Sequence, residues 1–168
     1  SLYVVANYAE KHFVDNLLDS NEGKAIGLSY FKERGFSDET IGKFKLGYAI
    51  DSFEAFTSAA TTNGYKQSFL VDSGLTKEKN GKQYDGYRGR VIFPIHNLSG
   101  RPIGFGGRTL KTDKKTPKYV NSPQNAIYDK SKVLYGLFTA KKTIIQNDNC
   151  FLVEGYTDVI SMYQAGVQ

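Results

Sequence analysis

The stretch VIFPIHNLSGRPIGFGGRTL, from Val91 to Leu110, decides the fold of this chain. Two apolar, β-prone runs flank the sequence HNLSG, whose asparagine, serine and glycine are typical of a tight turn. The pattern predicts an antiparallel hairpin, and with it a mixed or antiparallel β subdomain. On either side we expect irregular structure, with residues 76–90 as a glycine-rich polar loop and residues 111–123 as an extended or looped basic segment.

The segments before the hairpin have the apolar periodicity of short helices. Gly35 is placed as a helix stop and Ser37 as the N-cap of the next helix, with Asp38 and Glu39 in its first turn. Segments of this length, joined by glycine turns, predict a small helical subdomain. The expected helical segments are 7–20, 24–36, 37–50, 52–65 and 66–75.

The C-terminal part combines a helix with a strand. Residues 133–146 are expected to be helical. The apolar run CFLV, Cys150 to Val153, is expected to be a buried strand followed by a helix over residues 157–166, which is the opening of a parallel α/β unit. Cys150 is the single cysteine, so we expect a buried small hydrophobe and neither an internal disulfide nor a zinc cluster.

Charge is unevenly distributed along the chain. Residues 1–87 carry 10 Lys and Arg against 12 Asp and Glu, residues 88–142 carry 12 against 2, and residues 143–168 carry 0 against 3. A concentrated basic segment that is also rich in Tyr, Phe and Gly favours a polyanionic partner such as nucleic acid or nucleotide phosphates. A solvated basic surface with no partner is the alternative that charge leaves open.

Two carboxylates at the C-terminal end are candidate ligands of a metal ion. Glu154 directly follows the apolar run, so it projects into the crevice beyond the end of the expected strand, and Asp158 lies four residues later at the start of the next helix. Hard divalent cations prefer carboxylate oxygens, but two carboxylates are too few for a tight Mg²⁺ site without phosphates or further acids. The alternative is that Asp158 is a helix N-terminal acid and Glu154 a solvated loop residue.

Two motifs in the basic segment are candidates for binding nucleotides. In the GFGGR motif, residues 104–108, no helix follows the glycines, so the motif is either a strand that a ligand approaches closely or a bulged strand. The TPKYVNSP motif, residues 116–123, places a cation, an aromatic ring and an amide in a loop braced by prolines, a combination suited to a phosphate, a base and a sugar. An ordinary surface loop is the alternative. His12 and His96 are isolated and are interpreted as structural.

Taken together, three blocks resemble a known family. The sequences RGRVIFPIHNLSGRPIGFGGRTL, TPKYVNSPQNAIYDKSKVLYGL and FLVEGYTDVISMYQAGV, in that order, strongly resemble the catalytic core of bacterial replicative DNA primases of the DnaG type. The sequence YFKERGFSDETIGKFKLGYA, residues 30–49, is similar to the N-terminal subdomain of that core. The resemblance begins near residue 1 and is densest from Arg88 to the C-terminus.

The resemblance implies a fold and two domains. We expect an α+β chain: a small helical part and a mixed or antiparallel β subdomain, followed by the first β–α unit of an α/β Toprim domain. Residues 1–142 would be the basic N-terminal subdomain of the core, and residues 143–168 the beginning of the Toprim domain. The family's remaining metal-centre acids, its zinc-binding module and its helicase-interacting domain would lie outside this chain. We therefore expect the chain alone to bind nucleic acid weakly and to make no primer.

The resemblance also implies residues for the site. Glu154 and Asp158 would be catalytic residues that belong to an incomplete site for Mg²⁺ or Mn²⁺. The positions that would hold template, primer or incoming nucleotide are Arg34, Arg88, Arg90, Arg108, Lys118, Tyr119, Asn121 and Lys130.

The implied activity is the synthesis of short RNA primers on a single-stranded DNA template from nucleoside triphosphates. The implied partners are the template, the RNA primer, the nucleotides and, through regions outside this chain, the replicative helicase and single-stranded DNA-binding protein. No apolar run approaches the roughly 20 residues of a membrane span and no signal peptide opens the chain, so we expect a cytoplasmic protein at the replication fork that makes no contact with a membrane. Two alternatives stay open: a non-catalytic module that binds single-stranded nucleic acid, and another Toprim enzyme, such as a phage primase–helicase or a topoisomerase-like protein.

Overall fold

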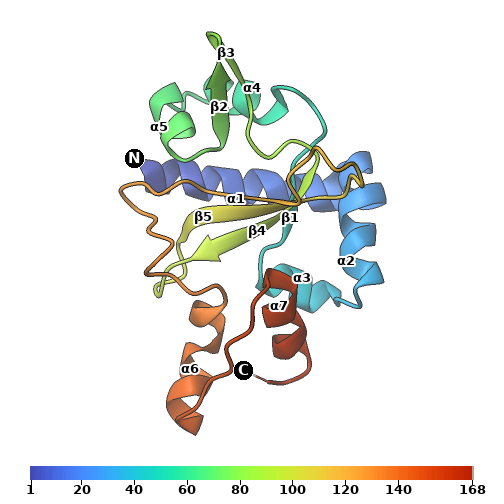
Figure 1. Ribbon diagram of the computed structural model, residues 1–168, viewed down its shortest axis with the longest axis vertical. Helices are drawn as coiled ribbons and strands as arrows, with labels where there is room; N and C mark the ends of the chain where they lie inside the picture. Colours follow the sequence, from blue (N-terminus) through green and yellow to red (C-terminus); the bar gives the residue numbers. More distant parts are fainter. Residues whose placement is uncertain (168) are drawn as a thin grey trace.

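The computed structural model describes residues 1–167, and its elements lie in three tiers along the long axis (Figure 1). The helices are α1 (Leu2–Asp19), the π-helix η1 (Gly23–Leu28), α2 (Ser29–Glu33), α3 (Asp38–Lys43), α4 (Ala55–Thr62), α5 (Gln67–Asp72), α6 (Leu137–Asn147) and α7 (Tyr156–Gln164). The strands are β1 (Gly47–Tyr48), β2 (Thr76–Lys79), β3 (Lys82–Asp85), β4 (Arg90–His96), β5 (Pro102–Thr109) and β6 (Tyr119–Asn121). The expected α+β fold class is confirmed.

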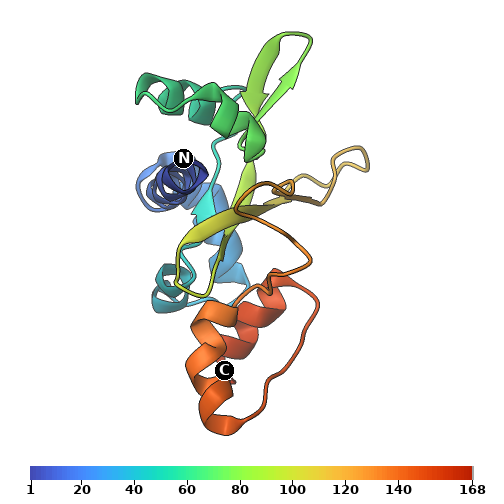
Figure 2. The same cartoon turned by 90° about the vertical axis from the view of Figure 1, so that its left-hand side faces the viewer.

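The middle tier is an antiparallel sheet with strand order β1-β4-β5-β6, crossed by α1. One end of the molecule carries the β2–β3 hairpin with α4 and α5, and the other carries α6 and α7 (Figure 2). The predicted hairpin over residues 91–110 is therefore confirmed as β4 and β5, with HNLSG at its turn. Among residues 1–167, no helix has both the length and the hydropathy that crossing a membrane requires.

Strand β4 is buried on both faces, which explains its uninterrupted apolar sequence. Ile92 packs in a cluster with Phe13 of α1 and with Phe105. Its neighbour Phe93 points to the opposite face and joins a second cluster that contains Phe31 of α2 and Ile160 of α7. The sheet therefore has one side covered by α1 and another side onto which the C-terminal helix docks.

The helices before the sheet follow the local signals closely. Gly35 adopts a positive φ of 81°, which a glycine tolerates, and ends the helical segment of α2. Ser37 caps α3, since its hydroxyl accepts a hydrogen bond from the Thr40 N–H at 3.1 Å. The expected helix over residues 37–50 is wrong beyond Lys43. Residues Gly47–Tyr48 instead form β1, because pairing with β4 and burial of the Tyr48 ring override the weak helical pattern.

The expectation of a loop over residues 76–90 holds for residues 86–89 but is wrong for residues 76–85. Strands β2 and β3 pair there in register, and Asn80 and Gly81 join them with φ values of 53° and 71°. Two successive positive φ values define the tight hairpin turn that an Asn-Gly pair favours. This local signal was present in the sequence but was outweighed by the many polar residues around it.

The expectation of a buried strand at CFLV is wrong in this structure. Phe151 and Leu152 are 67% and 81% exposed, Cys150 is exposed, and no strand within residues 1–167 pairs with this segment. A strand requires a neighbour for its backbone hydrogen bonds, and an apolar side chain requires a layer that covers it. The helix after it is confirmed as α7, whereas the helix before it begins only at Leu137 and buries none of its residues. The predicted boundary between residues 142 and 143 falls inside α6 and stays a prediction.

Asp85 connects the β2–β3 hairpin to α4. Its carboxylate oxygens accept hydrogen bonds from the backbone N–H groups of Phe56 and Thr57, at 2.8 and 2.9 Å, in the first turn of α4. The side chain is buried, and burial raises the pKa of its carboxyl group although the two N–H donors oppose that rise.

We expect Asp85→Ala to lower the free energy of unfolding by about 2 kcal/mol, because two buried N–H donors lose their acceptor. Urea unfolding measures this. Asp72→Ala, which removes an exposed carboxylate at the end of α5, is the control and should change stability by less than about 0.5 kcal/mol. Equal losses in the two variants would contradict the assigned role of Asp85.

Candidate nucleic-acid and nucleotide interface

Two of the predicted arginines share one aromatic ring. The guanidinium groups of Arg34, at the end of α2, and Arg108, on β5, lie 4.8 and 5.3 Å from the ring centroid of Tyr30. These are cation–π distances, so the ring holds both positive charges close together. Burial raises the pKa of the Tyr30 hydroxyl, although the two arginines oppose that rise. Arg108 donates from one terminal nitrogen to the Thr109 carbonyl, and its buried Nε has no partner among residues 1–167.

Strand β6 carries the aromatic and amide residues of the TPKYVNSP motif. Tyr119 pairs with Arg108 and Asn121 pairs with Gly106, so the side chains of Arg108, Tyr119 and Asn121 share one face of the sheet. The structure therefore brings together three of the residues that the sequence predicted. Lys118 precedes the strand directly and is exposed, so its ammonium group extends the charge of this face.

The glycines of β5 leave room for the ring of a tyrosine from α7 to pack against the strand. A Cβ atom on Gly106 would lie 2.6 Å from the ring of Tyr156, and that ring stacks on Phe93 at 5.1 Å with an angle of 9° between the planes. The Tyr156 hydroxyl donates to Asn121 Oδ1 at 2.6 Å, and the Tyr119 ring lies 6.1 Å away. The GFGGR motif therefore lies in a strand whose glycines admit rings of the protein itself, and it positions α7 against the basic face; close approach of a ligand to this strand stays a prediction.

The two predicted metal ligands differ in their surroundings. Asp158 accepts a hydrogen bond from the Gly155 N–H at 3.1 Å and so caps the first turn of α7, which is the structural role considered for it. Glu154 is exposed and forms no ion pair or hydrogen bond within residues 1–167. No group of three or more metal-ligating side chains occurs in that part of the chain. The residues present therefore fit a divalent cation only as part of a larger ligand set.

One cavity connects the acidic and the aromatic residues. It has a volume of 570 Å³ and lies between β6, α6, α7 and the segment before α7. Tyr119, Asn121, Glu154 and Tyr156 all line it. Most of its lining is apolar, with Leu134, Phe151 and Leu152 as examples, and no Lys or Arg within residues 1–167 lines it, so the basic residues lie beside the cavity rather than in it.

Arg90 is placed differently from the other predicted arginines. It is only 6% exposed, and one of its terminal nitrogens donates to the carbonyl oxygens of Gly107, Pro117 and Lys118 at 3.3, 2.9 and 3.2 Å. Its guanidinium group thus holds the loop that carries Lys118 against β5. Arg90 therefore positions the interface through these carbonyl groups, a role that the sequence motif did not reveal, and its contact with a ligand stays a prediction.

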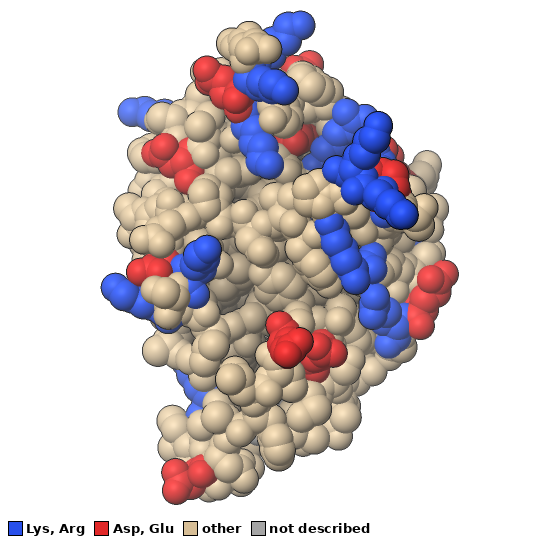
Figure 3. Space-filling model, viewed as in Figure 1, with Lys and Arg blue, Asp and Glu red and all other residues tan. Residues whose placement is uncertain are grey.

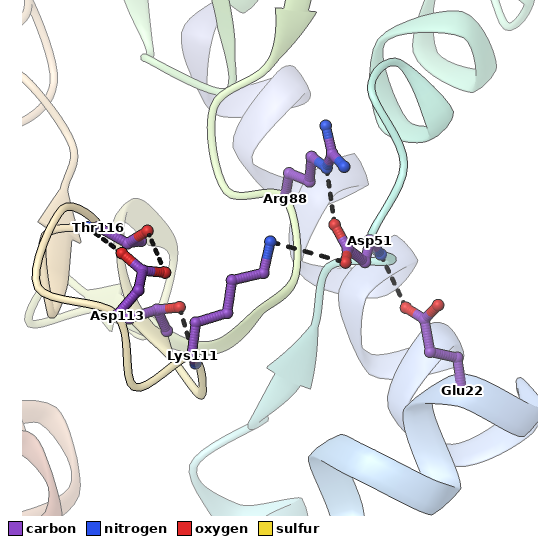
Figure 4. A network of polar contacts seen from close by, with 7 residues as sticks. Glu22, Asp51, Arg88, Lys111, Asp113 and Thr116 are labelled. Atoms are coloured by element: carbon purple, nitrogen blue, oxygen red, sulfur yellow. Dashed lines mark hydrogen bonds and ion pairs between the residues drawn. The ribbon is translucent and has the colours of Figure 1, made fainter.

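Arg88 belongs to a separate polar network (Figure 4). Its Nε lies 2.6 Å from Asp51, whose other oxygen lies 3.9 Å from Lys111 Nζ. The hydrogen bond from Arg88 lowers the pKa of the Asp51 carboxyl. Asp113 organises the basic loop by accepting hydrogen bonds from Lys115 and Thr116. Asp51 therefore ties the basic segment to the body of the protein, Asp113 acts only within the loop, and both acids neutralise part of the segment's charge.

Lys130 lies in the loop between β6 and α6, and no contact within residues 1–167 joins it to the other predicted residues. Lys and Arg side chains gather along one side of the face shown in Figure 3. Tyr30 and Tyr156 are the residues that sequence reasoning missed as part of the interface. The four-residue spacing of Tyr30 and Arg34 on a helix is the signal that places a guanidinium group over a ring.

Comparison with protein families gives a match to the model of the DNA primase catalytic core, N-terminal domain, over residues 13–141. Among curated proteins, the chain is 42% identical over 168 residues to a DNA primase of Halalkalibacterium halodurans and 44% identical over 167 residues to a DNA primase of Deinococcus radiodurans. These alignments cover 99% and 98% of this chain but 28% of each relative.

Solved structures give the same result. The RNA polymerase domain of Mycobacterium tuberculosis primase DnaG superposes with a TM-score of 0.90 at 32% identity, and the catalytic core of the E. coli primase with 0.88 at 33%. A DnaG primase catalytic domain bound to single-stranded DNA superposes with a TM-score of 0.82 at 34% identity. Each alignment covers 99% of this chain and between 52% and 53% of the solved chain.

Proposed function

The chain belongs to the DNA primase family, as the N-terminal part of its catalytic core, and from this premise we propose that the whole protein synthesises short RNA primers on single-stranded DNA. One observation carries the proposal: Glu154 lines the same 570 Å³ cavity as Tyr119 and Asn121, next to the basic face that contains Arg108. Primer synthesis requires both an acidic centre and a surface that binds phosphates, and this cavity adjoins both.

The proposed reaction is nucleotidyl transfer. The 3′ hydroxyl of the growing primer attacks the α-phosphorus of a nucleoside triphosphate, a new phosphodiester bond forms and pyrophosphate leaves. A divalent cation supplies neutralisation of phosphate charge in such a transfer. Glu154 would contribute to holding it, together with acids from outside this chain, and Mg²⁺ or Mn²⁺ are the expected metals.

The remaining residues would bind and orient. Arg34 and Arg108, fixed on the Tyr30 ring, are placed to bind the phosphates of a nucleotide, with Lys118 adding charge at the rim. Tyr119 offers a partly exposed ring for stacking. Arg90 and the Arg88–Asp51 pair hold the surrounding loops. The proposed partners are the single-stranded template, the primer and the nucleotides, and, through regions outside this chain, the replicative helicase and single-stranded DNA-binding protein at the replication fork in the cytoplasm.

A non-catalytic module that binds single-stranded nucleic acid is the second candidate, because residues 1–167 bring no three metal-ligating side chains together. Primer synthesis by the full-length protein on a single-stranded template distinguishes the two. Template-dependent synthesis that requires a divalent cation supports the enzyme, and binding without synthesis supports the module.

We expect the double substitution Lys118→Ala and Lys130→Ala in the full-length protein to weaken binding to single-stranded DNA. The slope of log affinity against log salt should fall by about 0.7 for each lysine that contacts a phosphate. Fluorescence anisotropy with a labelled oligonucleotide over a salt series measures this. Lys24→Ala with Lys66→Ala, two exposed lysines from elsewhere, is the control of equal charge. An unchanged slope would remove both lysines from the proposed contact.

A further inference from the structure

The β2–β3 hairpin has two chemically different faces. Cross-strand pairs place Thr76 opposite Asp85 and Glu78 opposite Gln83 on one face. That face is turned toward α4, since the Thr76 hydroxyl lies 2.8 Å from the Thr57 hydroxyl and Asp85 caps the helix. The face of the hairpin that contacts α4 therefore serves to hold the fold together.

The other face of the hairpin is basic and aromatic. Lys77 pairs with Tyr84, and Lys79 pairs with Lys82, so all four side chains point away from α4. Phe53 stacks on Tyr84 with ring centroids 5.6 Å apart and an angle of 28° between the planes. We call this surface, made of Phe53, Lys77, Lys79, Lys82 and Tyr84, the outer hairpin face.

The fold gains little from these residues. Like charges directly opposite one another, as at Lys79 and Lys82, destabilise a two-stranded sheet. None of the three lysines forms an ion pair within residues 1–167. Phe53 leaves 49% of its surface in water, so the ring is open to a further partner on the side away from Tyr84. A ligand that neutralises the lysines and covers the ring would offset this cost.

The outer hairpin face also lies next to the polar network of Asp51, Arg88 and Lys111. Phe53 lies two residues after Asp51, whose carboxylate contacts both Arg88 and Lys111 (Figure 4). The backbone of Phe53 is tied to the hairpin, because its carbonyl accepts a hydrogen bond from the Asp85 N–H at 2.7 Å. Figure 3 shows Lys and Arg side chains from the hairpin end down one side of the same face.

From this arrangement we propose that the outer hairpin face binds single-stranded nucleic acid, with the lysines on phosphates and a base stacked on the Phe53–Tyr84 pair. Lysines that follow a backbone beside aromatic rings that stack bases are the usual means of binding single strands without sequence preference. A single strand is favoured over an acidic protein because it supplies phosphates for the lysines and planar bases that stack on the Phe53–Tyr84 pair. The inference extends the proposed function by adding a second binding site for the same single-stranded nucleic acid, at the hairpin end of the molecule. It rests on the proposed function only in identifying that nucleic acid as the template.

The test compares two lengths of labelled single-stranded DNA on the full-length protein. With Lys77, Lys79 and Lys82 all replaced by Ala, we expect weaker binding of an oligonucleotide of about 20 nucleotides, with a salt slope lower by about 2, and unchanged binding of one of about 6 nucleotides. Phe53→Leu keeps an apolar side chain but removes the stacking surface, and should weaken binding of the longer oligonucleotide by about tenfold with an unchanged salt slope.

The matched control is the triple substitution of Lys24, Lys43 and Lys66 by Ala, which removes the same charge from exposed positions outside the hairpin and outside the basic segment. Thermal unfolding confirms that each variant folds. Equal affinity and slope for the hairpin and control variants would overturn the proposal, and would leave an acidic protein surface as the remaining kind of partner. Weaker binding of the longer strand by a protein that makes no primer would uphold the hairpin site while contradicting the proposed synthesis.

Discussion

In the full-length protein, Glu154→Gln is expected to lower primer synthesis by about 1,000-fold, because a neutral amide replaces a carboxylate of the proposed metal centre. The glutamine has the same shape, and Glu154 makes no hydrogen bond within residues 1–167 that the change would break. Binding of single-stranded DNA should therefore stay within about twofold. Primer synthesis from labelled nucleotides and anisotropy on the same preparation measure the two effects.

Asp148→Asn is the control for Glu154→Gln. Asp148 is an exposed acid in the same region and has a positive φ of 50°, which an asparagine tolerates. Its replacement should leave primer synthesis unchanged. Full activity of the Glu154→Gln protein would contradict the proposed role. Asp158→Asn adds a second comparison, because the amide oxygen still accepts the Gly155 hydrogen bond, so a loss of activity there reports the charge rather than the helix cap.

The second large effect is expected at Arg90. Arg90→Met keeps most of the side-chain volume but removes the donors to the carbonyl oxygens of Gly107, Pro117 and Lys118. The contact with the Gly107 carbonyl is buried and the other two are partly buried, and the Lys118 carbonyl keeps a hydrogen bond from the Thr109 N–H, so we expect the free energy of unfolding to fall by about 2 kcal/mol. Because the freed loop carries Lys118 and Tyr119, the KM for nucleotides should rise in the protein that still folds.

Urea unfolding and steady-state kinetics of the full-length protein measure the effect of Arg90→Met. Arg101→Met is the control, since Arg101 is exposed and lies over the Tyr3 ring at 4.0 Å, a contact worth at most about 1 kcal/mol. Equal losses of stability in the two variants would show that the three carbonyl contacts of Arg90 contribute little.

The sequence predicted correctly those caps and turns whose interacting residues lie close together along the chain. The Ser37 cap, the Gly35 stop and the HNLSG turn each involve residues within a few positions of one another. The Asn80–Gly81 turn was equally local, and missing it was an error of weighting rather than a limit of the sequence. Strand β1 was missed for a different reason, because its two residues form a strand only by pairing with β4.

The candidate site shows the same division. The motifs identified Arg108, Tyr119 and Asn121, and the structure places them on one face of the sheet. No motif shows that Arg90 is a buried positioning residue whereas Arg88 is exposed. The three carbonyl partners of Arg90 lie on a strand and a loop that come near it only in the folded chain. The buried strand expected before Glu154 was wrong for a related reason, since burial depends on what covers a segment and not on its own hydropathy.

The glycines of β5 have a consequence for how the chain folds. Gly104, Gly106 and Gly107 offer no side chains of their own, and the rings that pack on them belong to Tyr128, Tyr156 and Tyr87. Tyr156 lies far along the chain, so its contact with β5 requires a long loop to close before any packing energy is gained. We expect β5 to become rigid late, after α1 and β4 have collapsed together. During synthesis on the ribosome, the basic face would therefore be completed only after α7 has emerged.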